Sequence, residues 1–418
     1  MRITRAVIVT VVVMLLGCDT GNRVDPIFQD YFIKYYGEDG NQEGVDLYVN
    51  DDGTMALLGN SYSLTEPKQP VIVKTDSLGN VLWQRTLGAQ NETAVDVELI
   101  TQGPHQGKWV VVSNVGQRPD ARIRLTIVDQ SGKGIDSLIV DSPVWQIAES
   151  VTIASNDDFL ISGSIAPDAT KNPNFTNHED DNEDIVVLRV TQSLETTNVP
   201  WVQQGGQYNG WGVKTFEVTL SGTLKYAVFG WSDYSLPGSA IFEDKFDVIA
   251  FDEDGGRTGL EPRSKLVGEK QTASQAIKVP ASQEDGFFMI GSSQSGSNTD
   301  IYISKYSKDL STQKLDQKIP LGGKMEGIAV ASAIQDEGYF LLGNEIQDNS
   351  NRNIFLLHMR LDGSQVWSST FGTAEGNDTA GAVAALKNGR VAVLGTIDLE
   401  TQQKMALIIV DRNGGFSN

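Results

Sequence analysis

Hydrophobic residues in this chain occur in short runs separated by turn-forming residues, and this pattern extends from about residue 31 to the C-terminus. The runs are rich in Val, Ile, Leu, Phe and Tyr, and clusters of Gly, Asn, Asp and Ser lie between them. No long stretch repeats apolar residues at the spacing of three and four that an amphipathic helix requires. Together with the 42 glycines, the pattern predicts an all-β protein of short strands and tight turns.

One apolar run recurs seven times and ends in a small residue each time. The copies are MALLG (55–59), VVVS (110–113), FLISG (159–163), YAVFG (226–230), FFMIG (287–291), YFLLG (339–343) and VAVLG (391–395). Another β-rich run follows each copy, and several of these end in Asp-x-x-Gly, as at Asp76 to Gly79. Asp at the first position and Gly at the fourth favour a type I turn.

A third kind of run carries an aromatic residue that is followed five positions later by glycine, as at Trp83 and Trp367. Each repeat therefore holds four strands, which we name A to D from the axis outward. Four short strands in a repeat of this length are typical of one blade of a β-propeller.

The two ends of the repeat array predict how the ring closes. The array begins with a D-type strand (31–37) and ends after a C-type strand (405–411). We therefore expect the N-terminal strand to complete the last blade, which removes the free sheet edges there. The predicted fold is a single seven-bladed β-propeller over residues 31–418.

Two segments also resemble a known family. DSLGNVLW (76–83) and LDGSQVW (361–367) are similar to the Asp/Gly-to-Trp turn of the tryptophan-bearing repeats in quinoprotein-like β-propellers. Some members of that superfamily are lipid-anchored propellers that assemble outer-membrane proteins. The resemblance implies the fold and little about activity, because propellers carry many unrelated functions.

The first residues have the features of an export signal. Arg2 and Arg5 flank the start of an apolar run (6–16) that is too short to cross a bilayer as a helix. The run leads into Leu-Leu-Gly-Cys, which resembles the bacterial lipobox, where the cysteine is lipidated after cleavage just before it. We therefore expect a signal peptide (1–17), a lipid anchor and tether (18–30) with lipid on Cys18, and a location in the bacterial cell envelope, on the periplasmic side or at the cell surface. An ordinary signal peptide is the alternative.

The charge of the chain narrows the range of partners. Removal of residues 1–17 takes away two arginines and no acid, so the net charge changes from −21 to −23. Such a surface repels nucleic acid and anionic headgroups. We expect a monomeric propeller attached to a membrane through Cys18, with no nucleic-acid partner. Because Cys18 is the single cysteine, no intramolecular disulfide supports the fold.

Common catalytic and cofactor motifs are absent from the sequence. The three histidines form no His-x-x-x-His pair, and there is no Gly-x-Ser-x-Gly segment. No cofactor is predicted, although five acids near the start of strand A could form a partial ring that binds Ca²⁺ at one mouth of the channel. These acids are Glu43, Glu92, Glu149, Glu326 and Asp378. Capping of neighbouring turns is the alternative role for them.

Two insertions give the third and fourth blades long loops between strands B and C, at 164–184 and 231–246. These B–C loops lie on the same face as the D–A loops, and we name it the B–C face. The insertions and the loop 207–212 hold the predicted ligand-binding residues Phe175, His178, Asp180, Asp181, Trp211, Trp231, Asp233, Tyr234 and Phe242. Exposed aromatics beside acids suit a polypeptide or carbohydrate ligand. Loops that merely cover the blade edges are the alternative.

The sequence therefore favours a non-enzymatic binding or scaffolding module outside the cytoplasm, with a polypeptide or carbohydrate ligand. Two other functions remain open. One is a propeller glycoside hydrolase or lyase that uses carboxylates at the channel mouth, with Glu149 and Glu326 as the residues to test. The other is a structural subunit of an envelope assembly complex.

Overall fold

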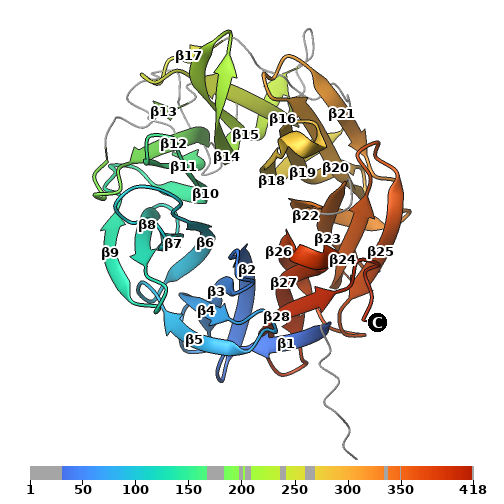
Figure 1. Ribbon diagram of the computed structural model, residues 1–418. Coiled ribbons are helices and arrows are strands. Elements are labelled where there is room, and N and C mark those ends of the chain that lie inside the picture. Colours follow the sequence, from blue (N-terminus) through green and yellow to red (C-terminus); the bar gives the residue numbers. More distant parts are fainter. Residues whose placement is uncertain are drawn as a thin grey trace, which may run out of the picture. The chain divides into compact units, whose positions relative to one another are not determined.

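The computed structural model describes residues 31–166, 183–196, 201–202, 209–235, 242–258, 269–333, 338–348 and 350–416. These residues form seven four-stranded antiparallel sheets arranged as blades around a central axis (Figure 1). The predicted all-β, seven-bladed propeller is confirmed. Cys18, Phe175, His178, Asp180 and Asp181 lie outside the described residues, as do the expected signal peptide and tether. Within the described ranges, no helix is long and apolar enough to cross a membrane.

Each of the first six blades takes its four strands in sequence order, from the axis outward. The first three blades are β2 (Asn41–Val49), β3 (Met55–Tyr62), β4 (Gln69–Thr75) and β5 (Val81–Thr86); β6 (Glu92–Leu99), β7 (Trp109–Val115), β8 (Arg122–Val128) and β9 (Gly134–Ile139); and β10 (Gln146–Ile153), β11 (Phe159–Ile165), β12 (Asp184–Val190) and β13 (Trp201–Val202). The next three are β14 (Gly210–Leu220), β15 (Thr223–Ser235), β16 (Phe242–Phe251) and β17 (Arg257–Thr258); β18 (Lys270–Val279), β19 (Gly286–Ser295), β20 (Asn298–Ser307) and β21 (Gln313–Lys318); and β22 (Lys324–Ser332), β23 (Tyr339–Ile346), β24 (Arg352–Met359) and β25 (Gln365–Phe371). Short 3-10 helices occur at η1 (Ala281–Gln283) and η2 (Lys387–Gly389).

The seventh blade joins the two ends of the propeller. It contains β26 (Thr379–Ala385), β27 (Val391–Asp398), β28 (Gln403–Val410) and, on its outer edge, β1 (Phe32–Tyr36). β1 pairs antiparallel with β28, from Phe32 opposite Ile409 to Tyr36 opposite Met405. The expected closure by the N-terminal strand is therefore confirmed.

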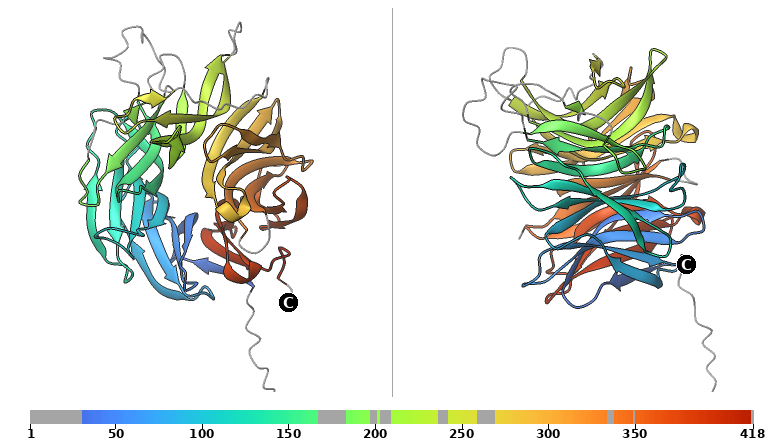
Figure 2. Two further views of the ribbon diagram at one scale, coloured as in Figure 1. Left: turned by 45° about the horizontal axis from the view of Figure 1, so that its top comes forward. Right: turned by 90° about the vertical axis from the view of Figure 1, so that its left-hand side faces the viewer.

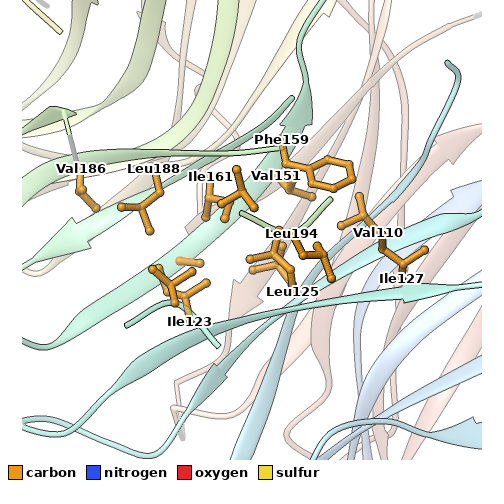
Figure 3. Close-up of a cluster of buried hydrophobic side chains, with 14 of the residues drawn as sticks. Val110, Ile123, Leu125, Ile127, Val151, Phe159, Ile161, Val186, Leu188 and Leu194 are labelled. Atoms are coloured by element: carbon orange, nitrogen blue, oxygen red, sulfur yellow. The ribbon is translucent and has the colours of Figure 1, made fainter. Parts of the chain in front are cut away.

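The hydrophobic core lies between neighbouring blades. Figure 3 shows one such cluster, in which Val110 and Leu125 of the second blade face Val151, Ile161 and other side chains of the third. Side chains alternate between the two faces of a strand, and both faces of a blade are covered. The middle strands are therefore apolar at nearly every position, and all seven residues of β11 are buried. The two further views in Figure 2 show the blades packed side by side around the ring.

In four of the blades, an aromatic side chain on strand D contacts the C–D turn of the next blade. Trp83 Nε1 donates a hydrogen bond to Gln130 O at 3.0 Å, and its ring lies against Gly132 at the end of the Asp-x-x-Gly turn in the second blade. Corresponding contacts join Trp201 to Gly255, Trp367 to Gly414, and Phe32 to Gly79. The aromatic residue and the Asp-x-x-Gly turn are thus two halves of one contact, which we name the outer latch.

We expect Gly132→Ala to destabilise the protein more than Gly107→Ala. Both glycines have φ +81°, so both variants carry the cost of about 1 kcal/mol for a side chain in the left-handed region. A Cβ at Gly132 would lie 2.8 Å from Trp83 Cε3, whereas no atom lies within 4 Å of one at Gly107. The clash should add about 1–3 kcal/mol to the loss of unfolding free energy, measured by urea denaturation. Equal losses of unfolding free energy in the two variants would show that Trp83 does not pack tightly against Gly132.

Candidate functional site

Every innermost strand contains a β-bulge at the same point of its blade. The bulges interrupt the pairing between Gly44 and Asp46, Ala94 and Asp96, Ala148 and Ser150, Gly212 and Lys214, Ala273 and Gln275, Gly327 and Ala329, and Ala380 and Ala382. The residue before the bulge is always Gly or Ala, and we call it the pre-bulge residue. The residue after the bulge, the post-bulge residue, varies from blade to blade.

The bulge explains the small residue that ends each MALLG-type run. It directs a carbonyl oxygen of strand A toward strand B, so a Cβ at Gly163 would clash with Ile147 O. The corresponding clash at Gly291 would be with Thr272 O. Glycine therefore occupies this position in six blades, and the small Ser113 occupies it in the second.

Pre-bulge backbone N–H groups are bound by side chains of the preceding blade. Ala94 N donates to Asn60 Oδ1 at 2.8 Å, and Ala380 N donates to Asn344 Oδ1 at 2.8 Å. Three more such bonds run from Ala148 N to Asn114 Oδ1, Gly327 N to Ser292 Oγ, and Gly44 N to Thr396 Oγ1. These bonds hold neighbouring blades together close to the axis.

The innermost strands surround a cavity of about 640 Å³ on the axis of the propeller. Its wall has two chemically different halves. Blades one to four contribute the ionisable residues Asp46, Asp96, Glu98, Glu149 and Lys214. Blades five to seven contribute no acid; their lining residues are small, polar or apolar, among them Gln275, Ile277, Ile328 and Val330, with Lys278 as the one ionisable group.

Lys214 lies at the centre of the charged half. Its Nζ is 3.0 Å from Asp96 Oδ2 and 3.0 Å from Glu98 Oε1, and it donates to Val151 O at 2.8 Å. Asp96 Oδ2 also accepts the backbone N–H of Val151 at 2.7 Å. One lysine of the fourth blade therefore binds groups of the second and third blades.

The charges in this cluster stabilise one another. Burial raises the pKa of Asp46 well above its usual range, and the neighbouring Asp96 adds to this effect. Burial opposes the charge of Lys214, but the two carboxylates that it contacts raise its pKa. Burial likewise opposes the charge of Asp96, but Lys214 lowers its pKa. The cluster therefore favours an ionised Asp96–Lys214 pair and disfavours a second charge on the neighbouring Asp46.

A stack of aromatic and guanidinium groups lies on the B–C face near the channel. The Arg118 guanidinium carbon is 4.1 Å from the centroid of the Trp145 ring and 5.7 Å from that of Trp211. Trp211 and Trp231 are parallel, with centroids 6.4 Å apart and an interplanar angle of 1°. Arg118 also forms an ion pair with Glu183. The rings of Trp145 and Trp211 therefore pack on Arg118, so they are not simply open platforms for a sugar.

Three carboxyl groups in this sector have pKa values raised to about 7. Burial is the first cause for Glu149, Asp184 and Asp233. The charge of Glu183 adds to the shift at Glu149, and Asp244, directly across from Asp233 on β16, adds to the shift there. Groups with such values change charge near neutral pH, which is common at functional sites.

Comparison with known proteins identifies the fold. No protein-family model and no curated protein matches the sequence. An ulvan lyase solved with a bound saccharide is 10% identical, with 92% of this chain and 98% of that chain covered and a TM-score of 0.55. The Dos1 propeller is 9% identical (92% and 96% covered, TM-score 0.48), and the β-propeller domain of the Trilobed protease from Pyrococcus furiosus is 11% identical (90% and 98% covered, TM-score 0.45). The shared feature is the β-propeller fold alone.

The five acids expected to form a ring do not occupy equivalent positions. Glu43 and Glu326 lie two residues before the bulged residue, Glu92 and Asp378 lie three before it, and Glu149 is itself bulged. Of the five, Glu149 alone is in the cavity lining. The others have local partners: Lys68 for Glu43, Arg124 for Glu92, Arg352 for Glu326 and the backbone N–H of Asp398 for Asp378. In the described part of the chain, no group of three or more His, Cys, Asp or Glu side chains is placed to hold a metal ion. Calcium binding stays a prediction.

Part of the predicted ligand-binding surface is brought together. Trp211 and Trp231 stack, and Asp233 follows on the same strand. Tyr234 and Phe242 continue the β15–β16 pair, although only their backbones are described. Sequence reasoning missed Arg118, Trp145 and the charged post-bulge residues. The recurring triplets Gly-Val-Asp (44–46), Ala-Val-Asp (94–96) and Gly-Val-Lys (212–214) contain the signal that locates the post-bulge residues.

We expect Lys214→Met to destabilise the protein by about 3–5 kcal/mol, because it leaves the buried Asp96 charge, and the partly exposed Glu98, without their cation. Lys68→Met is the matched control, since Lys68 pairs with Glu43 at 2.7 Å but is 40% exposed, against 13% for Lys214. The control should cost at most about 1 kcal/mol. Urea denaturation at neutral pH measures both losses, and similar values would contradict a structural role for the channel cluster.

We expect Glu149→Gln to change how stability depends on pH. The pKa of Glu149 is about 7 in the folded protein against an ordinary value of 4.5, so the unfolded chain loses this proton first. The folded state of the parent is therefore progressively disfavoured as pH rises from about 4.5 to above 7. Because glutamine has no such proton, the stability of the variant relative to the parent should rise by about 1–3 kcal/mol over this range. Parallel stability curves from denaturation at several pH values would contradict the shift.

Proposed function

We propose that this protein is a lipid-anchored binding module outside the cytoplasm, which holds a polypeptide segment with basic and apolar side chains in its central channel. One observation carries the proposal: all four acids of the channel wall lie in blades one to four, whereas blades five to seven contribute aliphatic and small polar residues together with Lys278. An extended segment can present basic side chains to one side and apolar ones to the other. A saccharide, with hydroxyl groups around each ring, matches such a divided wall less well.

The size and rigidity of the channel agree with this ligand. A volume of about 640 Å³ lies in the range of small-molecule and side-chain sites. It admits a few side chains of a loop or terminus but no folded domain. Pre-bulge bonds and the Lys214 ion pairs fix the wall before a ligand arrives, and this preorganisation lowers the entropy cost of binding.

The charge of the site also favours a basic ligand. The channel wall holds the four carboxyl groups of Asp46, Asp96, Glu98 and Glu149 and two lysines, Lys214 and Lys278, and the whole chain carries a net charge of −21. Complementary charge speeds association and excludes acidic competitors. The lipobox-like segment ending at Cys18 supports a location at a membrane in the cell envelope, where exported polypeptides are available.

A saccharide hydrolase or lyase is the second candidate, and one observation favours it. Glu183 is paired with Arg118, while the nearby Glu149 has a pKa of about 7. Carboxyl groups in such different surroundings are suited to act as a base and an acid. Glu326, the partner expected for Glu149 in the sequence, is instead bound by Arg352 at 2.9 Å and is outside the cavity lining.

We expect the full chain in detergent to bind a short peptide of alternating Lys and Leu, and not its Glu–Leu counterpart or chito-oligosaccharides. Fluorescence anisotropy of the labelled peptide measures the affinity. The affinity should rise as pH increases through about 7, because Glu149 then becomes charged. Glu149→Gln should lower the affinity at pH 8 about tenfold, or about 1.4 kcal/mol, and remove this pH dependence.

Glu43→Gln is the matched control, because Glu43 lies on the same face but is bound by Lys68 outside the cavity. It should bind the Lys–Leu peptide as the parent does. Equal binding of the two peptides would contradict the proposal. If the parent cleaves an oligosaccharide and Glu149→Gln does not, the saccharide enzyme is favoured instead. If the chain binds an envelope protein in a fixed ratio and does not bind the peptide, an assembly subunit is favoured.

A further inference from the structure

Exposed apolar side chains gather on the outer edge of three consecutive blades. β5 of the first blade, β1 of the seventh and β25 of the sixth follow one another along the rim from the lower left to the right-hand side of Figure 1. Their exposed residues are Ile33 (40%), Tyr35 (49%), Val81 (52%), Leu82 (54%) and Val366 (39%), and Phe416 (45%) lies after the last strand. We name these six residues the docking edge. Contiguous exposed apolar surface often marks a protein or membrane contact.

The strands of the docking edge are joined by direct contacts. Lys34 of β1 donates to Leu78 O at 2.6 Å and to Asn80 Oδ1 at 2.7 Å, in the turn before β5. On the other side, Trp367 Nε1 of β25 donates to Arg412 O at 2.7 Å, in the turn after β28. These hydrogen bonds link the outer edges of the sixth, seventh and first blades.

A groove lined by two arginines opens beside Val366. It has a volume of about 550 Å³ and lies between the turn before β25 and the turn after β28. Its lining combines two arginines with apolar side chains and three other polar residues: Arg360, Arg412, Leu361, Val366, Trp367, His358, Asp362 and Asn413. Both arginines are exposed. Guanidinium groups bind phosphate through two parallel hydrogen bonds, and tryptophan favours the boundary between lipid and water.

The path of the chain brings this edge close to the expected lipid. Residues 19–30 separate Cys18 from the described start of the propeller, just before β1. Even when fully extended, they reach about 40 Å. A lipid on Cys18 would therefore keep β1 near the bilayer surface, and the apolar side chains of β1 belong to the docking edge.

We propose that the docking edge rests on the surface of the phospholipid bilayer, with Arg360 and Arg412 on lipid phosphates and the apolar side chains among the headgroups. This inference rests on the proposed lipid anchor at Cys18. Long side chains can bury their apolar part at such an interface while their charge stays in water. Blades three and four lie on the opposite side of the ring from the seventh blade (Figure 1), so docking would hold their part of the B–C face away from the membrane.

Single cysteines can test the contact in the full lipidated chain on phosphatidylcholine vesicles. Val366→Cys and Leu82→Cys place a thiol-reactive fluorophore on the docking edge. Leu224→Cys is the matched control, because Leu224 is a similarly exposed apolar residue (44%) in the fourth blade. Since lipidation blocks Cys18, the introduced cysteine is the one that takes the dye.

Spin-labelled lipid should quench the dye at residues 366 and 82 several-fold more than at residue 224. Arg360→Ser combined with Arg412→Ser should reduce the quenching at residue 82 toward the value at residue 224. Equal quenching at all three positions would contradict membrane contact by the docking edge. So would a dye response without vesicles, caused by pairing of two chains. Neither result would contradict the lipid anchor. Dye uptake by the unsubstituted chain would reveal a free Cys18 and would overturn both proposals.

Discussion

The β-bulge in the innermost strand of each blade is the constraint on which the rest of the structure depends. It turns a carbonyl toward strand B, where glycine leaves room for it, and it frees a backbone N–H that side chains such as Asn60 bind from the preceding blade. A bulge also bends its strand and redirects the following side chain. In this chain the redirected side chains include Asp96 and Lys214, which meet at the axis.

Two sets of contacts at different distances from the axis hold the blades together. Near the axis, the pre-bulge bonds join strand B of one blade to strand A of the next. At the rim, outer latches such as Trp83 on Gly132 join strand D to the next turn. Contacts at two radii resist both sliding and tilting of one blade against the next. Pairing of β1 with β28 completes the ring without a disulfide.

The fold could be predicted from the sequence because each inter-blade contact leaves a local mark. The small residue that ends each MALLG-type run recurs in every blade, and the Asp-x-x-Gly turn and the D-strand aromatic recur in several. The register of strand A could not be predicted in this way, since the bulge inserts one residue and shifts the alternation of faces. Glu149 and Glu326 therefore looked equivalent in the sequence, whereas one lines the channel and the other binds Arg352. The Arg118 stack joins groups from three blades, and its residues belong to no repeated motif in the sequence.

The charged side chains of the channel are distinct from the contacts that join neighbouring blades. In the sixth and seventh blades the post-bulge residues are Ala329 and Ala382, yet pre-bulge bonds from Asn344 and Thr396 still join these blades to the next. A charged post-bulge residue is therefore not needed to join neighbouring blades. Burying charge is also a poor way to gain stability, because desolvation offsets much of the Coulomb attraction. The rigid ring therefore leaves the channel side chains free to differ between blades, and all four acids of the channel wall lie in blades one to four.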